Sequence, residues 1–269
     1  MIINIAGGTG VMGRVHKPVF ERAGHEVILS GRHSKPTLEE AAEQADLTIV
    51  SVPISATREV IERVGSYCNG IMDFTGVKEL PLRAMLEYAK PEVEVGGLHP
   101  LYGEVDSIKG RSVVYCPTGR SREKCGEIAE CFILAGAEIV RMKPEEHDFA
   151  MAILQNARTH ILGAYTLLIK ELKNKGLSSE QVYRIAPRPT QIMMDLAARQ
   201  ADERNDKLYR EMRTFNHYQW EVDEKLSRCL TEVLCDEGNS TPSMIRTFLE
   251  KEQLGLAQER ARKLMSSGK

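Results

Sequence analysis

The 269-residue sequence is poor in aromatic residues, nearly balanced in charge and without a long apolar run. Aromatic residues make up 6% of the chain, and the formal net charge is −2. No stripe of lysine and arginine interleaved with aromatics occurs, so the pattern typical of nucleic-acid binding is missing. No stretch approaches the ~18 consecutive apolar residues that span a bilayer, and no charged leader precedes an apolar segment. We therefore expect a cytoplasmic protein that binds a small-molecule substrate rather than nucleic acid or a membrane.

Cysteine is sparse, and its spacing favours neither a zinc site nor a disulfide framework. Cys125 and Cys131 lie six residues apart, as do Cys229 and Cys235, whereas a metal or redox pair usually has CxxC spacing. His147 and Asp148 are adjacent and have no convergent third ligand in the sequence. We expect no metal site, and we expect all six cysteines to be buried free thiols.

A glycine-rich turn follows the first apolar run of the chain. The turn consists of Gly8, Thr9, Gly10, Val11, Met12 and Gly13. This is a GxGxxG pattern, in which Gly8 permits the tight turn, Gly10 lets the backbone approach a pyrophosphate, and Gly13 lets helix pack on strand. The run at residues 2–6 has the character of a strand, and residues 12–23 have that of a helix, whose first amides favour a phosphate. The pattern predicts a dinucleotide site.

The end of the next predicted strand, residues 25–30, indicates which dinucleotide. An enzyme selective for NAD carries an Asp or Glu there to bind the ribose 2′-hydroxyl, and this chain has none. Ser30, Arg32 and His33 instead supply a hydroxyl, a guanidinium and an imidazole, which suit a 2′-phosphate. We expect NADP rather than NAD.

Short apolar runs alternate with helical patterns through residues 1–143, which predicts a doubly wound, mostly parallel sheet of the Rossmann type. Expected strands lie near 1–6, 25–30, 47–52, 69–73, 93–97, 112–116 and 137–141. Expected helices lie at 11–23, 36–45, 55–66, 79–89 and 120–135. Ligands of such sheets bind beyond the carboxyl ends of the strands, so Val52 and Pro53, at the end of the third strand, are predicted to contact the cofactor.

Residues 144–269 carry helical periodicity and are predicted to form a second, all-α domain. Ser178 is predicted to start one helix, Pro187 and Pro189 to interrupt the next, and Ser240 to open a last capped helix. The apolar faces of this domain have no other partner in the chain, so we expect a homodimer formed through it. The two domains account for both ends, and we expect no further fused domain or regulatory module.

Three segments give the chain a family resemblance. Residues 51–54 (SVPI), 72–79 (MDFTGVKE) and 97–103 (GLHPLYG), each after a predicted strand, resemble the prephenate dehydrogenase family. The similarity continues through residues 144–148 (PEEHD) into the helix that follows. The resemblance implies oxidative decarboxylation of prephenate to 4-hydroxyphenylpyruvate, in tyrosine biosynthesis. Together with the side chains after residue 29, it predicts an NADP-dependent enzyme.

The resemblance also implies roles for particular residues. His99 is the expected catalytic residue, since a neutral imidazole can accept the proton of the substrate's 4-hydroxyl as hydride leaves the same carbon. Arg199 resembles the arginine that binds a prephenate carboxylate. Gln155 lies two turns along the helix after His147 and is expected to face the substrate. His147 itself is interpreted as a capping and packing residue.

Two positions depart from the family pattern. Gly76 stands where a serine is usual, so Thr75 is predicted to supply the missing hydroxyl. Thr159 stands where many members carry a histidine, and His160 replaces that histidine only if the helix is locally overwound or bulged. These changes, at the expected substrate-binding positions 76, 159 and 160, keep open a related substrate such as arogenate or 4-amino-4-deoxyprephenate. They also keep open a non-catalytic NADP-binding paralogue.

Overall fold

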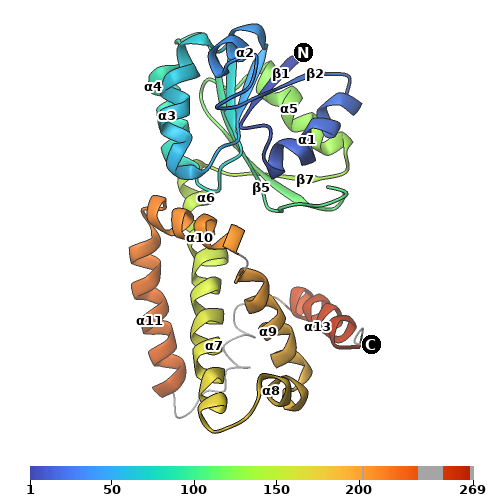
Figure 1. Ribbon diagram of the computed structural model, residues 1–269, viewed down its shortest axis with the longest axis vertical. Helices are drawn as coiled ribbons and strands as arrows, with labels where there is room; N and C mark the ends of the chain where they lie inside the picture. Colours follow the sequence, from blue (N-terminus) through green and yellow to red (C-terminus); the bar gives the residue numbers. More distant parts are fainter. Residues whose placement is uncertain (202, 236–250, 267–269) are drawn as a thin grey trace. The chain divides into compact units, whose positions relative to one another are not determined.

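A seven-stranded sheet forms the centre of the first part of the molecule (Figure 1). The computed structural model describes residues 1–201, 203–235 and 251–266. The strands are β1 (Ile2–Ala6), β2 (Glu26–Ser30), β3 (Leu47–Val50), β4 (Gly70–Asp73), β5 (Glu94–Pro100), β6 (Ser112–Pro117) and β7 (Glu138–Arg141). Their order is β2-β1-β3-β4-β5-β6-β7, and every neighbouring pair is parallel except β5 with β6. The predicted doubly wound, mostly parallel sheet is confirmed.

Helices cover both faces of this sheet. They are α1 (Val11–Arg22), α2 (Leu38–Gln44), α3 (Ile54–Val64), α4 (Glu79–Tyr88) and α5 (Glu123–Leu134), followed by α6 (Pro144–Met151). Successive strand residues point to opposite faces, so each strand contributes to two cores. Ile3 and Ile5 pack with Phe20 of α1 and Phe132 of α5, whereas Ala6 belongs to the cluster under α3 and α4. The strands are apolar runs because helices bury both of their faces, and the helices show an apolar stripe because one side of each packs on the sheet.

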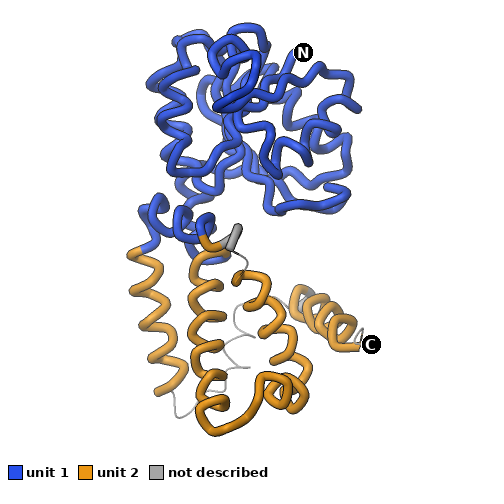
Figure 2. Tube along the Cα trace, viewed as in Figure 1, with its two compact units in different colours: residues 1–154, 207–219 blue, residues 155–206, 220–269 orange. Residues whose placement is uncertain are grey.

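The chain divides into two compact units at places that differ from the expected boundary at residue 143 (Figure 2). The first unit comprises residues 1–154 and 207–219, and the second comprises residues 155–206 and 220–269. Helix α6 belongs to the first unit because His147 and Asp148 are buried in it. The segment 207–219 joins it as well, since Met212 packs against Ile54 and Val77. The boundary predicted at residue 143 rested on the change of periodicity there, and it did not include the later segment 207–219 in the first unit.

The second unit is helical, as predicted. Its helices are α7 (Arg158–Asn174), α8 (Ser179–Ile185), α9 (Arg188–Gln200) and α13 (Lys251–Ser266), with most of α11 (Gln219–Cys235) and the start of α10 (Glu203–Phe215). The predicted cap at Ser178 is present, because its hydroxyl accepts from the Gln181 amide at 3.1 Å. Pro187 separates α8 from α9. The predicted helix start at Ser240 lies outside the described residues.

The cysteines and the helix lengths bear on two further expectations. Cys68, Cys116, Cys125 and Cys131 are buried free thiols, but Cys229 and Cys235 are exposed. The prediction that all six are buried is therefore wrong for the two on α11, a helix with an exposed face. In the part of the chain that the structure describes, no helix has the length and apolar character needed to cross a membrane.

His16, on α1, is a buried histidine held in its neutral form. Its Nδ1 donates to the Met12 carbonyl at 2.8 Å, which leaves Nε2 to accept from the Tyr102 hydroxyl at 2.9 Å. The rings of Phe74 and Phe132 lie 4.8 Å and 5.2 Å from it, centroid to centroid. Burial lowers the pKa of His16 to about 4, so the folded state disfavours its protonation.

This histidine makes the stability of the protein depend on pH. The unfolded chain binds the proton near pH 6.5 and the folded chain only near pH 4, so stability is full above pH 6.5 and is lost as the pH falls toward 4. We expect His16 to account for a loss of about 2 kcal/mol in the free energy of unfolding between pH 7.5 and 5. Urea unfolding at both pH values measures it. A His16→Phe variant should lack this part of the pH dependence, and an unchanged dependence would contradict the assignment.

Candidate functional site

The glycine-rich turn between β1 and α1 has no room for side chains at its key positions. A Cβ added at Gly8 would lie 2.6 Å from Leu29 Cδ2 and 2.7 Å from the Ile5 carbonyl oxygen. A Cβ at Gly13 would overlap the Gly8 carbonyl. Helix α1 begins at Val11 with Gly10 as its N-cap, so its first amides, which have no acceptor within the helix, lie at the turn. This cradle fits the pyrophosphate of a dinucleotide.

Three predicted cofactor-binding side chains lie at the end of β2: an exposed arginine, an exposed histidine and a buried serine. Arg32 and His33 are exposed in the turn after the strand. Ser30 is fully buried, and its hydroxyl donates to the Asn4 side-chain oxygen at 2.8 Å. The predicted use of the Ser30 hydroxyl for a 2′-phosphate is therefore not met, because that donor is committed inside the sheet. Arg32 and His33 are left as the side chains that suit the phosphate.

The end of β3 lies against the glycine turn. Gly7 has a φ of +87°, and a Cβ there would lie 2.8 Å from Val52 Cγ1. Val52 is partly buried against the core, and Pro53 is the N-cap of α3. The two predicted cofactor contacts, Val52 and Pro53, therefore lie at the same edge of the sheet as the glycine turn, which follows the carboxyl end of β1.

His99, near the carboxyl end of β5, is almost completely buried, with 7% of its surface exposed. Its Nδ1 lies 2.8 Å from His147 Nε2, and the two rings meet edge to face. Burial lowers the pKa of His99 well below its usual value, and the neighbouring His147 and Lys78 lower it further. His99 is therefore unprotonated at neutral pH, which a proton acceptor requires.

Behind His99 stands a second histidine and a carboxylate. His147 Nδ1 lies 2.7 Å from Asp148 Oδ1. Asp148 is bound in turn by two backbone amides at the start of α4, those of Lys78 at 2.7 Å and Glu79 at 3.0 Å. Sequence reasoning took His147 for a capping and packing residue and missed this chain of contacts. The adjacent pair HD gave no signal of it, because the partner His99 lies 48 residues earlier.

The turn after β4 is closed by a buried ion pair. Lys78 and Asp73 are both fully buried and in contact, and Lys78 Nζ also donates to the Leu98 carbonyl at 2.8 Å. The Thr75 hydroxyl contacts Asp73 and lies 2.7 Å from the Val77 carbonyl. The predicted catalytic role of Thr75 is not met by this geometry, since its hydroxyl is used to close the turn.

Gly76 lies directly beside the free nitrogen of His99. A Cβ added at Gly76 would be 3.6 Å from His99 Nε2 and 3.4 Å from Met212 Cγ, which are ordinary contact distances. A side chain would therefore fit here without strain, and the glycine leaves space next to Nε2. Met212, from the returning segment 207–219, is 4% exposed and borders the same space. The space beside Nε2 is thus bordered by a thioether instead of a hydroxyl.

The remaining predicted substrate residues belong to the second unit. Gln155 Oε1 is buried and has no hydrogen-bond partner among the described residues. The Thr159 hydroxyl donates to the Gln155 carbonyl at 2.8 Å, and His160 pairs with Asp223 at 3.0 Å. A π-helical turn at residues 152–157, which is a local bulge in the helix, precedes these two residues. Arg199 lies in the last turn of α9.

Comparison with known proteins identifies the first unit. The family model described as "Prephenate dehydrogenase, nucleotide-binding domain" matches residues 9–141. The chain carries the nucleotide-binding domain of the prephenate dehydrogenase family. The glycine turn and His99 both fall inside the matched residues.

Curated relatives and solved structures agree with this family. A probable arogenate/prephenate dehydrogenase of Methanocaldococcus jannaschii is 28% identical over 87% of this chain and 56% of its own length. The T-protein of Enterobacter agglomerans is 33% identical over 67% of this chain and 50% of its own. This chain thus spans about half the length of the curated relatives it matches.

The fold is shared with structures of low sequence identity. Prephenate dehydrogenase from Aquifex aeolicus, in complex with hydroxyphenyl propionate and NAD+, has a TM-score of 0.68 at 16% identity, covering 100% of this chain and 98% of that one. Synechocystis arogenate dehydrogenase has a TM-score of 0.57 at 16% identity, covering 98% of each chain. The prephenate dehydrogenase fold, with a helical part after the nucleotide-binding domain, is therefore present here.

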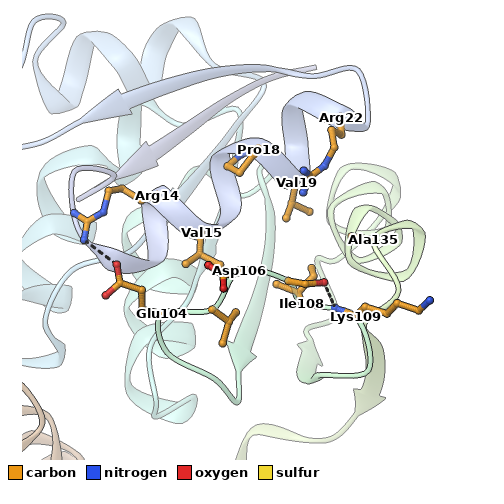
Figure 3. A pocket seen from close by; sticks show the side chains of 12 residues that line it. Arg14, Val15, Pro18, Val19, Arg22, Glu104, Asp106, Ile108, Lys109 and Ala135 are labelled. Carbon is orange, nitrogen blue, oxygen red and sulfur yellow. Dashed lines mark hydrogen bonds and ion pairs between the residues drawn. The ribbon is translucent and has the colours of Figure 1, made fainter.

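A pocket on the nucleotide-binding domain does not coincide with the predicted site (Figure 3). It has a volume of about 510 Å³ and lies between α1, the segment 104–109 and the end of α5. Two of its lining residues, Arg14 and Glu104, form an ion pair at 3.8 Å. Its lining mixes both charges with apolar side chains such as Val15 and Val19 and includes none of the predicted site residues. We assign no ligand to it.

Proposed function

We propose that this protein catalyses the NADP-dependent oxidative decarboxylation of prephenate to 4-hydroxyphenylpyruvate. The observation that carries the proposal is the placement of His99: a buried, unprotonated imidazole, near the carboxyl end of a strand, whose Nε2 lies 3.6 Å from the position that a Cβ at Gly76 would take. Ligands of doubly wound sheets bind at this edge. The relatives named above support a cyclohexadienyl acid as the substrate.

In the proposed reaction His99 handles one proton. Its Nε2 accepts the hydrogen bond, and then the proton, of the 4-hydroxyl as the carbon bearing that hydroxyl becomes carbonyl-like. The bound nicotinamide would accept the hydride that leaves this carbon. The ring carboxylate departs as carbon dioxide, and the electrons of the broken bond complete the aromatic ring. His99 then returns the proton to the phenol oxygen, so the imidazole ends neutral, as it began.

Substrate positioning is assigned to groups that recognise carboxylates and hydroxyls. We propose that Arg199 binds one carboxylate of the substrate in a bidentate pair and that Gln155, Thr159 and His160 line the same site. The buried, unpartnered Gln155 Oε1 supports this placement.

One observation favours a second candidate substrate. At Gly76 no hydroxyl is available beside His99 Nε2, so one hydrogen bond expected for a 4-hydroxyl is missing. This observation favours 4-amino-4-deoxyprephenate, which carries no 4-hydroxyl. Arogenate keeps the 4-hydroxyl and is an alternative because a curated relative is named as a probable arogenate/prephenate dehydrogenase. Initial rates of NADPH formation with the three acids would decide, and tight NADPH binding with no turnover of any of them would point to a non-catalytic paralogue.

The choice between NADP and NAD rests on the turn after β2. We expect Arg32→Ala to raise the KM for NADP by about tenfold and to leave the KM for NAD nearly unchanged, because the charge-assisted bond to the 2′-phosphate is lost. Steady-state kinetics with both cofactors measure this. The matched control is Arg22→Ala, at the far end of α1. An unchanged preference for NADP in Arg32→Ala would remove Arg32 from cofactor selection.

We propose a homodimer formed through the second unit. Its helices expose large apolar side chains that a monomer would leave in water. They include Leu167, Leu168, Ile185, Trp220 and Leu234, which are 66–84% exposed. A second copy of the chain is the partner that buries them, and sedimentation equilibrium would report a mass near twice that of the monomer.

The proposed location is the cytoplasm, in keeping with six cysteines that form no disulfide.

A further inference from the structure

The inner end of the His99–His147–Asp148 chain is fixed by backbone amides. Asp148 Oδ1 accepts from the Lys78 amide and Oδ2 from the Glu79 amide, at 2.7 Å and 3.0 Å. An ionised carboxylate can only accept hydrogen bonds. The 2.7 Å contact between His147 Nδ1 and Asp148 Oδ1 is therefore a bond that His147 donates. The Asp148 backbone is held as well, since the Asn216 side chain donates to its carbonyl at 2.7 Å.

In a neutral imidazole only one ring nitrogen carries a proton, so if one nitrogen is a hydrogen-bond donor the other must be an acceptor. His147 is fully buried, and burial lowers its pKa, so it carries a single N–H. With that proton on Nδ1, His147 Nε2 is an acceptor. The 2.8 Å contact between His147 Nε2 and His99 Nδ1 is then a bond that His99 donates. His99 Nε2 is left without a proton.

We propose that His147 and Asp148 are positioning residues that fix the tautomer of His99, so that its Nε2 faces the Gly76 space as an acceptor. A histidine free of such contacts prefers its proton on Nε2, which would make the same nitrogen a donor and unable to accept the substrate's proton. The chain of hydrogen bonds from Asp148 through His147 to His99, called the relay below, instead keeps the proton of His99 on Nδ1. The inference rests on the proposed function for its catalytic meaning, but the tautomer itself is a property of the protein without substrate.

The direct test is nitrogen-15 NMR of the histidine rings in the full chain, with His99 assigned by comparison with a His99→Asn variant. At pH 7.5 we expect His99 Nδ1 to have the chemical shift of a protonated nitrogen and Nε2 that of an unprotonated one. The reverse assignment in the wild-type protein would overturn the proposal without any variant of the relay.

Two substitutions at His147 separate positioning from packing. His147→Leu removes the acceptor for His99 Nδ1, so we expect His99 to move to the Nε2–H tautomer and kcat to fall by about 10²-fold. His147→Gln offers an amide oxygen to His99 and an amide N–H to Asp148, so we expect the wild-type tautomer and kcat within about tenfold of wild type. The KM for NADP should change little in either. His25→Gln, at a histidine outside the relay, is the control.

The outcomes separate this inference from the proposed function. If His147→Leu keeps the wild-type tautomer of His99, the relay does not set it, and the inference is wrong. If that variant does not fold, the wild-type spectrum and His147→Gln still decide, because loss of the Nδ1–H tautomer in the Gln variant would equally contradict it. If the tautomer depends on His147 as expected but no cyclohexadienyl acid is oxidised, the proposed function fails and the positioning role stands.

Discussion

The substitution His99→Asn is expected to lower kcat by a factor of about 10² or more while the affinity for NADP stays within about twofold. An asparagine can donate or accept a hydrogen bond at this place, but it cannot take up a proton at neutral pH. His99 is not among the neighbours of the glycines in the turn that fits the pyrophosphate, so we expect its substitution to leave the affinity for the cofactor unchanged. Turnover of prephenate followed by NADPH absorbance, together with fluorescence titration of NADPH, measures both quantities.

The matched control for this experiment is His25→Asn, at a histidine next to the start of β2. It should retain wild-type turnover. Near-normal turnover in His99→Asn would exclude His99 as the base and with it the proposed mechanism. Loss of NADPH binding in the same variant would indicate damage to the nucleotide-binding domain instead.

The second large effect is expected for Gly13→Ala. The added methyl group would overlap the Gly8 carbonyl, so α1 must move away from the turn or the turn must open. Either change misplaces the first amides of α1, and we expect the Kd for NADPH to rise by at least about tenfold and the free energy of unfolding to fall by about 1–3 kcal/mol. Fluorescence titration and urea unfolding measure the two changes.

Gly126→Ala provides the matched control for this glycine. Gly126 lies inside α5, and a Cβ there would meet no atom within 4 Å. Alanine favours a helix over glycine, so this variant should be as stable as wild type or more stable by up to about 1 kcal/mol, with unchanged cofactor affinity. If Gly13→Ala behaved like Gly126→Ala, the close approach of α1 to the turn would not matter for binding.

Much of the local structure of the chain was predictable from the sequence. Its seven strands and the helices between them appear where apolar runs alternate with helical patterns. The GxGxxG turn begins α1 at Val11, and Ser178 caps α8. Each of these depends on residues within a few positions of one another, because backbone conformation, helix capping and strand alternation are short-range effects.

Predictions that required a side chain to point in a particular direction fared less well. Ser30 and Thr75 were chosen for their hydroxyls, but one bonds Asn4 inside the sheet and the other closes the turn at Asp73. Exposure of Cys229 was likewise not visible in the sequence. A hydroxyl bonds the nearest acceptor that the fold provides, and that acceptor is set by tertiary packing.

The sequence by itself determined the sheet, the glycine turn and the presence of a histidine near the end of the fifth strand. Only the tertiary structure decided what stands behind that histidine. His147 and Asp148 reach His99 because α6 packs beside α4 in the first unit, and residues 207–219 return to hold Asp148 and border the Gly76 space. These contacts join residues 48 to 136 positions apart, so they depend on how helices pack onto the sheet and not on any local pattern.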